Sequence, residues 1–271
     1  MIPARPAVAI LALSLSGLPA WALQGGVAGK PGAWSENAEY LVEVNGSILN
    51  DAHLYTALGA SAVLIVAPEF ESPLIIRIQG REVLALAPSA VTEGGTPDEV
   101  HVNDAETRGQ PMPFTQVDDG IVFYSSDDRV RIFRRPPIIG STTVEEILTH
   151  PAYLSGMNAY EPSQKALSVL RSFTKPATIE VFFGSWCPHC KRTVPTLMKT
   201  FSEVDNPKIQ VTYIGVPPPP FKDFAPAKEK DIEGVPAFIV AVEGVEVGRV
   251  QRIPSGSTVE DELAKILEES K

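Results

Sequence analysis

The stretch Trp186-Cys187-Pro188-His189-Cys190 holds both cysteines of this 271-residue chain. It follows the apolar run Ile179 to Phe183 and precedes a stretch with helical character, Lys191 to Phe201. Cys187 is therefore expected where a strand ends and a helix begins, a place where first-turn amides and the helix dipole stabilise a thiolate. The spacing puts Cys190 one helical turn behind Cys187, close enough to form a disulfide with it. This layout predicts a redox-active dithiol.

Two cysteines three residues apart are also compatible with half of a zinc site or with a structural bridge. A structural zinc site needs four ligands. The histidines that would complete it are scattered along the chain without a second close pair: His53, His101, His150 and His189. A structural disulfide across so short a loop adds little stability, because the entropic gain grows with loop length. We favour redox chemistry, with no metal and no bound cofactor.

A second motif, Gly234-Val235-Pro236-Ala237-Phe238, begins another apolar run that ends at Val242. With the Trp-Cys-x-x-Cys motif upstream, in this order and at this spacing, the sequence resembles the thioredoxin superfamily over residues 161–271. The resemblance implies an α/β domain with a mixed sheet flanked by helices. It also implies that Pro236 is a cis-proline opposite the dithiol, where it would shape a substrate groove.

The same resemblance implies roles for the residues of both motifs. Cys187 would attack a substrate cysteine, or its disulfide would be attacked, and Cys190 would resolve the mixed disulfide. Trp186, Pro188 and Val235 would contact the substrate, the last through a backbone open to pairing with an extended strand.

The pair Pro188-His189, together with Val235, is more similar to the strongly oxidising Dsb oxidases than to thioredoxin, which has Gly-Pro between its cysteines. A cationic or hydrogen-bonding His189 would stabilise the Cys187 thiolate and so make the disulfide a better oxidant. Lowering a thiol pKa by three units corresponds to about 4 kcal/mol. The alternative is that His189 is a solvated residue at the helix start with no electronic role.

Two features depart from these families. Only 45 residues separate Cys190 from Pro236, which leaves no room for the helical domain that Dsb oxidases insert. Thioredoxin also carries a buried acid on the strand before its motif, whereas Val181 stands nearest that position here and Glu180 is shifted by one residue. Because side chains alternate along a strand, Glu180 is expected on the other face, in a salt bridge or at a sheet edge and not as a proton relay.

Residues 1–22 have the pattern of a secretory signal peptide. A basic residue, Arg5, precedes an interrupted apolar run that ends at the cleavage pattern Ala20-Trp21-Ala22. We therefore expect export to the periplasm, with an uncleaved anchor as the alternative. Structural disulfides persist in an oxidising compartment, yet the only cysteines of this chain are one close pair. We therefore interpret the pair as a site of thiol-disulfide exchange. The formal net charge of −10 argues against nucleic acid and anionic membranes as partners.

The remainder divides by composition into a smaller β-rich N-terminal domain, 30–135, and a linker with a short helix, 136–160. We expect a short helix over Asp51 to Ala60 and a hairpin across Ser125 to Asp128. The linker helix is expected from Thr142 to His150. The strands predicted in the first domain are Tyr40 to Val44, Ala62 to Ala67, Leu74 to Ile78, Val83 to Ala87, Ile121 to Tyr124 and Val130 to Phe133.

In the thioredoxin-like part the periodicity predicts helices and strands in alternation. The prolines Pro217 to Pro220 would hold a stiff extended loop at the carboxyl end of a strand, with Phe221 as an apolar contact for a peptide, or else form a rigid connector. The predicted elements are a helix in Glu161 to Phe173, strands Thr178 to Phe183 and Ile209 to Val216, a turn of helix near Phe224 to Lys230, a hairpin Ala237 to Gln251 and a helix Thr258 to Glu269.

Together these features predict an exported thiol-disulfide oxidoreductase that acts on protein cysteines, as an oxidase or isomerase. The alternatives are a dithiol reductase fed by a membrane electron donor, and a binding or assembly module whose thioredoxin-like domain is not catalytic. Expected partners are cysteine-containing substrate proteins and a redox partner, which in the reductase case is membrane-bound. The β-rich domain has no catalytic motif, and we expect it to serve partner recognition or homodimerisation.

Overall fold

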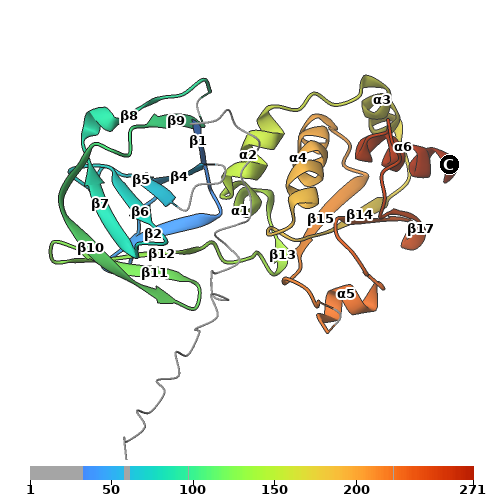
Figure 1. Ribbon diagram of the computed structural model, residues 1–271. Helices are drawn as coiled ribbons and strands as arrows, with labels where there is room; N and C mark the ends of the chain where they lie inside the picture. The colour runs from blue at the N-terminus through green and yellow to red at the C-terminus, as the bar shows by residue number, and fades with distance from the viewer. Residues whose placement is uncertain (1–32, 58–61, 97, 222) are drawn as a thin grey trace, which may run out of the picture. The chain divides into compact units, whose positions relative to one another are not determined.

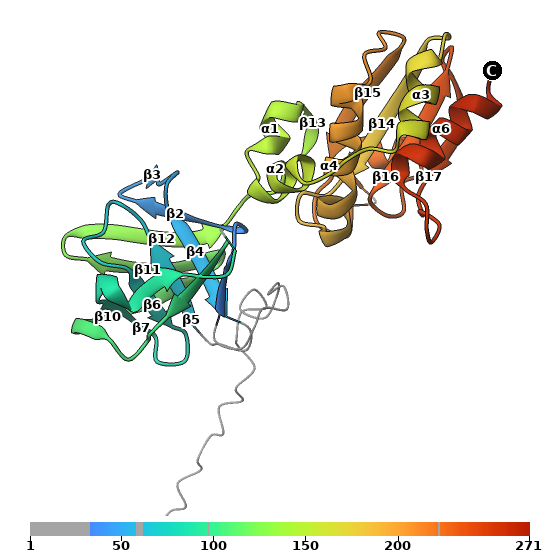
Figure 2. The same ribbon diagram turned by 90° about the horizontal axis from the view of Figure 1, so that it is seen from above.

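The computed structural model describes residues 33–57, 62–96, 98–221 and 223–271. The chain divides into two compact units, the first ending at Arg134 and the second beginning at Arg135 (Figures 1 and 2). The predicted signal peptide, 1–22, and the first residues of the predicted N-terminal domain lie outside the described residues.

The first unit is built from antiparallel strands. Within the described residues they form one sheet in the order β3-β2-β12-β11-β10-β7-β6-β5-β4-β1-β9-β8, with one 3-10 turn, η2, at Pro88–Ala90. The strands are β1 Ala33–Glu36, β2 Tyr40–Val44, β3 Ser47–Ile48, β4 His53–Ala57, β5 Ala62–Val66, β6 Leu74–Arg77, β7 Glu82–Leu86, β8 Val91–Glu93, β9 Glu99–Val102, β10 Thr107–Val117, β11 Gly120–Ser125 and β12 Asp128–Arg134.

This sheet buries apolar side chains on both faces of its central strands. On β6, Leu74 and Ile76 belong to one core, which they share with side chains of β2, β11 and β12, while Ile75 belongs to a second core with Trp34 of β1. Because successive residues of a strand point to opposite faces, one apolar run serves both cores. β10 pairs with β7 in its first part and with β11 in its second, with a register shift between Arg108 and Met112.

The strands predicted from apolar runs in this unit are confirmed, as is the hairpin between β11 and β12. The predicted helix over Asp51 to Ala60 is wrong where the structure describes it, because His53–Ala57 is strand β4, paired with both β1 and β5. Leu54 and Tyr55 of this strand enter the two different cores, which an amphipathic helix would not do. Residues 58–60 of that prediction lie outside the described residues.

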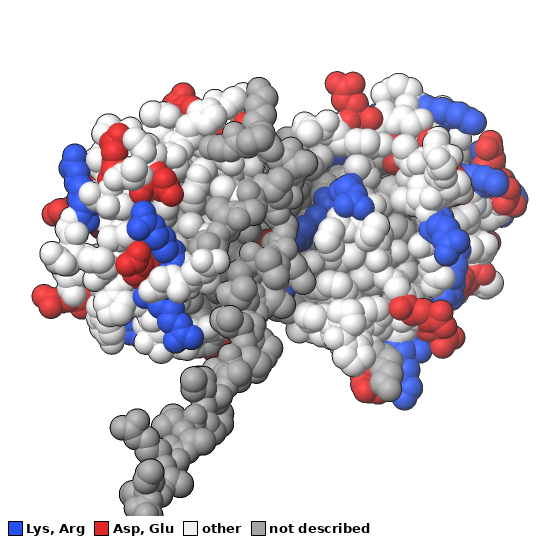
Figure 3. Space-filling model, viewed as in Figure 1, with Lys and Arg blue, Asp and Glu red and all other residues white. Residues whose placement is uncertain are grey.

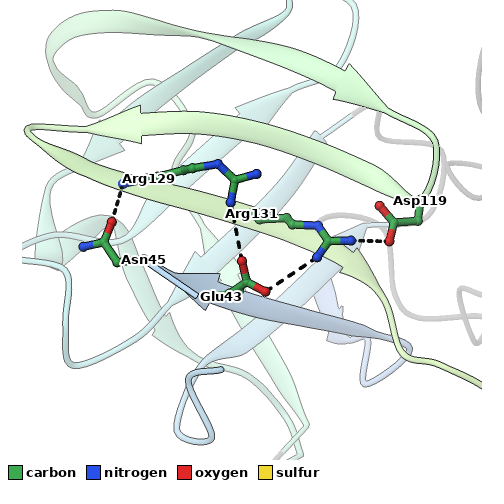
Figure 4. Close-up of polar contacts among 5 residues, drawn as sticks. All are labelled: Glu43, Asn45, Asp119, Arg129 and Arg131. Carbon is green, nitrogen blue, oxygen red and sulfur yellow. Dashed lines mark hydrogen bonds and ion pairs between the residues drawn. The ribbon is translucent and has the colours of Figure 1, made fainter. Parts of the chain in front are cut away.

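Acidic and basic side chains are interspersed on the face drawn in Figure 3. In the first unit, Glu43 of β2 lies between two arginines of β12, and its carboxylate oxygens are 3.5 Å from Arg129 and 3.6 Å from Arg131 (Figure 4). Arg131 also pairs with Asp119, and its guanidinium lies 4.3 Å from the centre of the Phe133 ring. These pairs follow from the register of β2 and β12, which places Glu43 opposite Arg131.

The second unit contains a five-stranded sheet in the order β13-β15-β14-β16-β17. β14 is parallel to β15 and antiparallel to β16, so the sheet is mixed, as predicted. Its elements are β13 Gly140–Thr142, α1 Val144–Leu148, α2 Pro151–Asn158, α3 Gln164–Ser172, β14 Ala177–Phe183, α4 Pro188–Glu203, β15 Ile209–Gly215, α5 Ala225–Glu229, β16 Ala237–Val242, β17 Val245–Val250 and α6 Val259–Glu269.

The two faces of this sheet are covered unequally. On β14, Val181 and Phe183 face the larger core, which includes side chains of α1, α2, α3, α4 and α6 and both cysteines. Phe182 faces the smaller core, to which α5 contributes Ala227. Figure 1 shows α5 apart from the other helices, across the sheet from α4. The dithiol therefore belongs to the helix-rich side.

Residues 136–160, which the sequence led us to interpret as a linker, are an integral part of the second unit. β13 pairs with β15, and Thr143 caps the start of α1, where its hydroxyl accepts from the Glu146 amide. The unpredicted helix α2 packs directly on α4, so closely that a Cβ on Gly156 would lie 3.0 Å from Pro195. Within the described ranges, no helix combines the length and the apolar character that crossing a membrane requires.

Candidate active site at the start of helix α4

Cys187 is the N-cap residue of α4, and Pro188 is the first helical residue. Proline suits this position because its missing N–H would have no partner in the helix. The turn from β14 into the helix is closed by the Cys187 amide, which donates to the Gly184 carbonyl oxygen at 2.9 Å. The motif therefore lies at the helix start that its spacing predicted.

The two thiols differ sharply in environment. Cys187 keeps 6% of its surface exposed, and Cys190 is fully buried. The pKa of Cys187 falls from 9.0 to about 5, first because the Cys190 thiol donates a hydrogen bond to its sulfur, and further because the amides of Cys190 and His189 point toward it. The same hydrogen bond and burial raise the pKa of Cys190. Cys187 is thus the thiolate of the pair.

Gly184 and Trp186 shape the loop between strand and helix. The Gly184 amide donates to the Cys190 sulfur at 3.3 Å. A Cβ on Gly184 would lie 2.5 Å from Cε2 of Trp186, so glycine is required here for space. The Trp186 indole N–H donates to the Val216 carbonyl oxygen at 3.0 Å, which fixes the ring over the loop.

The Val235–Pro236 peptide bond is cis, and this segment lies opposite the dithiol as the resemblance implied. The Cys187 sulfur is 3.7 Å from the Val235 carbonyl oxygen, to which the protonated thiol can donate. A thiolate has no proton to donate, so this contact favours the thiol, whereas the Cys190 hydrogen bond favours the thiolate. The Cys190 hydrogen bond is the largest cause of the lowered Cys187 pKa.

His189 is exposed in the first turn of α4, and its Nδ1 lies 2.9 Å from Nη2 of Arg192. A guanidinium can only donate, so Nδ1 accepts and the imidazole is neutral in this arrangement. Of the two roles expected for His189, cationic or hydrogen-bonding, this geometry fits a hydrogen-bonding ring beside the permanent cation of Arg192. If the ring were protonated, its charge would be the smallest of the causes that lower the Cys187 pKa, after the backbone amides.

Glu180 lies on the sheet face opposite the dithiol, as the alternation of the strand predicted. It forms an ion pair with Lys230, whose side chain is 40% exposed. Val181, at the position nearest the acid of thioredoxin, is fully buried on the cysteine side. The structure therefore brings Glu180 next to a lysine and not next to Cys190.

Phe221 is 8% exposed and packs in the smaller core with Phe182, Val216 and Ile232. It follows the proline loop Pro217 to Pro220, which is anchored to the sheet by this side chain. Little of its ring is accessible to a peptide in this arrangement, so its expected role as an apolar contact has no geometric support.

The sequence did not point to Tyr153 of α2 or to Ile138, both in the segment first interpreted as a linker. The Tyr153 hydroxyl lies 3.3 Å from the Gly184 carbonyl oxygen, and the Ile138 amide donates to the buried Ser185 hydroxyl at 2.9 Å. The burial of both contacts depends on tertiary packing, for which a local pattern gives no signal. Nowhere among the described residues do three or more His, Cys, Asp or Glu side chains gather as a metal site would need.

Comparisons with known proteins support the assignment of this domain. Residues 168–269 match the family model described as Thioredoxin. This stretch contains the dithiol motif and Pro236, and the match indicates a thiol-disulfide redox function in general. No curated protein matches the chain.

Among solved structures, the chain is similar to a protein of unknown function from Pseudomonas aeruginosa, with 14% identity, a TM-score of 0.38 and coverage of 48% of this chain and 88% of that one. Thioredoxin from Fasciola hepatica is 18% identical, with a TM-score of 0.28 and coverage of 38% and 89%. A mutant thioredoxin from Halobacterium salinarum is 21% identical, with a TM-score of 0.26 and coverage of 40% and 85%.

Proposed function

We propose that this chain is an exported protein thiol-disulfide oxidoreductase that acts as an oxidase or isomerase on cysteine-containing proteins. The observation that carries the proposal is the asymmetry of the pair, with Cys187 at a helix N-cap and a pKa of about 5, and Cys190 buried behind it. A thiolate stabilised in the reduced form makes the disulfide form a stronger oxidant. The Dsb-like dipeptide Pro188-His189 supports the same direction.

The proposed oxidation runs through a mixed disulfide. A substrate thiolate attacks the Cys187 sulfur of the Cys187–Cys190 disulfide, so the bond between the two protein sulfurs breaks and Cys190 leaves as a thiolate that takes up a proton. A second substrate thiolate then attacks the substrate sulfur of the mixed disulfide, and Cys187 leaves as the stable thiolate. Two electrons pass to the protein, and a separate redox partner removes them.

Export rests on the predicted signal at 1–22, which would place the dithiol in an oxidising compartment such as the periplasm. There a disulfide donor would meet newly exported proteins with reduced cysteines. The β-rich first unit would serve partner recognition or homodimerisation.

The test is oxidative refolding of a reduced, unfolded model protein, such as ribonuclease A, in a glutathione buffer. The oxidised chain should accelerate the return of ribonuclease activity, and Cys187→Ser should abolish the acceleration. Cys190→Ser should also abolish the acceleration, because no Cys187–Cys190 disulfide can form for a substrate thiolate to attack. Its Cys187 thiolate can still attack an existing substrate disulfide, and the mixed disulfide formed in that way should accumulate because Cys190 is no longer there to resolve it. If the wild-type chain leaves refolding unchanged but accelerates insulin reduction by dithiothreitol, the direction of the proposal is wrong.

A further inference from the structure

The Gly184 backbone contacts both cysteines of the site. Its carbonyl oxygen accepts from the Cys187 amide at 2.9 Å, and its own amide donates to the Cys190 sulfur at 3.3 Å. The orientation of this one residue therefore sets how the Cys190 thiol points and where the helix begins. Any side chain that fixes Gly184 also fixes the geometry of the dithiol.

Tyr153 is such a side chain. It comes from α2, outside the stretch matched to the thioredoxin family, and it is fully buried. Its hydroxyl donates to the Gly184 carbonyl oxygen at 3.3 Å. The ring is held edge-on against Phe183, with centroids 5.9 Å apart, and against His150, at 6.2 Å. Packing thus fixes the direction in which the hydroxyl points.

Gly184 is confined on its other side as well, because the space where a Cβ would lie is filled by the Trp186 ring. The Trp186 indole therefore packs against Gly184, and the Tyr153 hydroxyl donates a hydrogen bond to the Gly184 carbonyl oxygen. Removing only the Tyr153 hydroxyl would leave its ring packed as before. The Gly184 carbonyl oxygen would then lose the tyrosine hydrogen bond and keep the one from the Cys187 amide.

We propose that Tyr153 is a positioning residue of the dithiol site, which acts through Gly184 to hold the Cys190 thiol toward Cys187. The inference rests on the proposed function and deepens it. It assigns a redox role to the segment 136–160, which the sequence alone had presented as a linker.

The consequence can be followed in the thiolate. The Cys190 thiol is the main group that stabilises the Cys187 thiolate, so a Cys190 thiol that is free to turn stabilises it less. At 3.3 Å the tyrosine hydrogen bond is longer than usual for a hydroxyl donor, which places its worth at the low end of the usual range. We expect Tyr153→Phe to raise the Cys187 pKa by roughly half a unit, a threefold change in the ionisation constant.

The experiment is a pH titration of thiolate absorbance in the reduced full-length chain, with Tyr213→Phe as the matched control. Tyr213 lies in the same core at 5% exposure, on β15, and loses the same phenolic hydroxyl. Tyr153→Phe should raise the Cys187 pKa and lower the equilibrium constant for oxidation of glutathione by the protein disulfide roughly threefold, and Tyr213→Phe should change neither.

The proposal is overturned if Tyr153→Phe titrates as the wild type does, or if both variants shift the pKa equally, which would mean a general loss of core packing. The proposed function fails separately, if the wild-type Cys187 pKa is ordinary. The difference between Tyr153→Phe and wild type reports on positioning in either case.

Discussion

Acidification from pH 7 to pH 5 should lower the free energy of unfolding of the reduced protein by about 2 kcal/mol. The disulfide form should show no such loss, because it has no thiolate. The group responsible is Cys187, whose pKa is about 5 in the folded protein against 9.0 as an unperturbed thiol. Each unit of pKa difference is worth about 1.36 kcal/mol. At pH 7, two units above the folded value, the thiolate contributes about 2.7 kcal/mol, and at pH 5 only about 0.4 kcal/mol remains.

The sign follows from a pKa that is depressed on folding. The folded state binds fewer protons than the unfolded state between pH 5 and 9, so stability rises with pH in this window and is lost as the pH falls through 5. The pKa of Cys190 is raised, and its thiol stays protonated below pH 7 in both states. Cys190 therefore adds nothing to the difference between pH 5 and pH 7.

The assay is urea denaturation of the disulfide and dithiol forms at pH 5, 6 and 7, followed by tryptophan fluorescence. Both cysteines lie in the second unit, so the unfolding of the first unit serves as a reference that should not depend on redox state. Cys187→Ala supplies the matched control, because its reduced form has no thiolate to lose. A reduced protein whose stability changes with pH in parallel with the disulfide form would refute a depressed Cys187 pKa.

Three substitutions test the surrounding site. Gly184→Ala should destabilise the second unit by about 1–3 kcal/mol, because the new Cβ overlaps the indole of Trp186. Urea denaturation measures this loss, and Gly234→Ala is the control, because its Cβ meets open space and the loss should be small. Glu180→Gln should leave the thiolate titration of Cys187 unchanged and cost less than about 1 kcal/mol in urea, since its ion pair is partly exposed; a shifted titration would restore a proton-relay role. His189→Ala keeps the backbone amide and should raise the Cys187 pKa by less than about one unit in thiolate absorbance, and a larger rise would show that the ring carries a charge in the reduced protein.

The parts of the fold that the sequence predicted are those whose local pattern matches their tertiary environment. The apolar run before Cys187 becomes β14, and the dithiol falls at the start of α4. β10 was not predicted because Gly109, Pro111 and Pro113 interrupt its pattern, yet the strand pairs with β7 and β11, with a register shift in this stretch. Within the range predicted as a helix, His53–Ala57 instead forms a strand, because pairing with β1 and β5 overrides the local helix preference.

The candidate site shows the same division. The two cysteines and Pro236 carry a motif, and the structure brings them together. Tyr153 has no motif, and its contact with Gly184 exists only because α2 packs on α4 and the tyrosine is buried beneath the turn. The loop at the carboxyl end of a strand predicts Phe221 as an apolar contact for a peptide or as part of a rigid connector. In the structure its ring is buried in the smaller core, because an aromatic side chain next to a sheet gains more from packing than from exposure.

The central claim is that Cys187 and Cys190 form an oxidising couple, and the reduction potential at pH 7 tests it most directly. The protein would be equilibrated in glutathione buffers of graded ratio, quenched by alkylation and quantified by mass spectrometry. We predict a reversible two-electron couple between about −180 and −120 mV, in the range of disulfide-forming proteins. A potential at or below about −270 mV, the value of thioredoxin, or the absence of a reversible disulfide between the two cysteines would contradict the account.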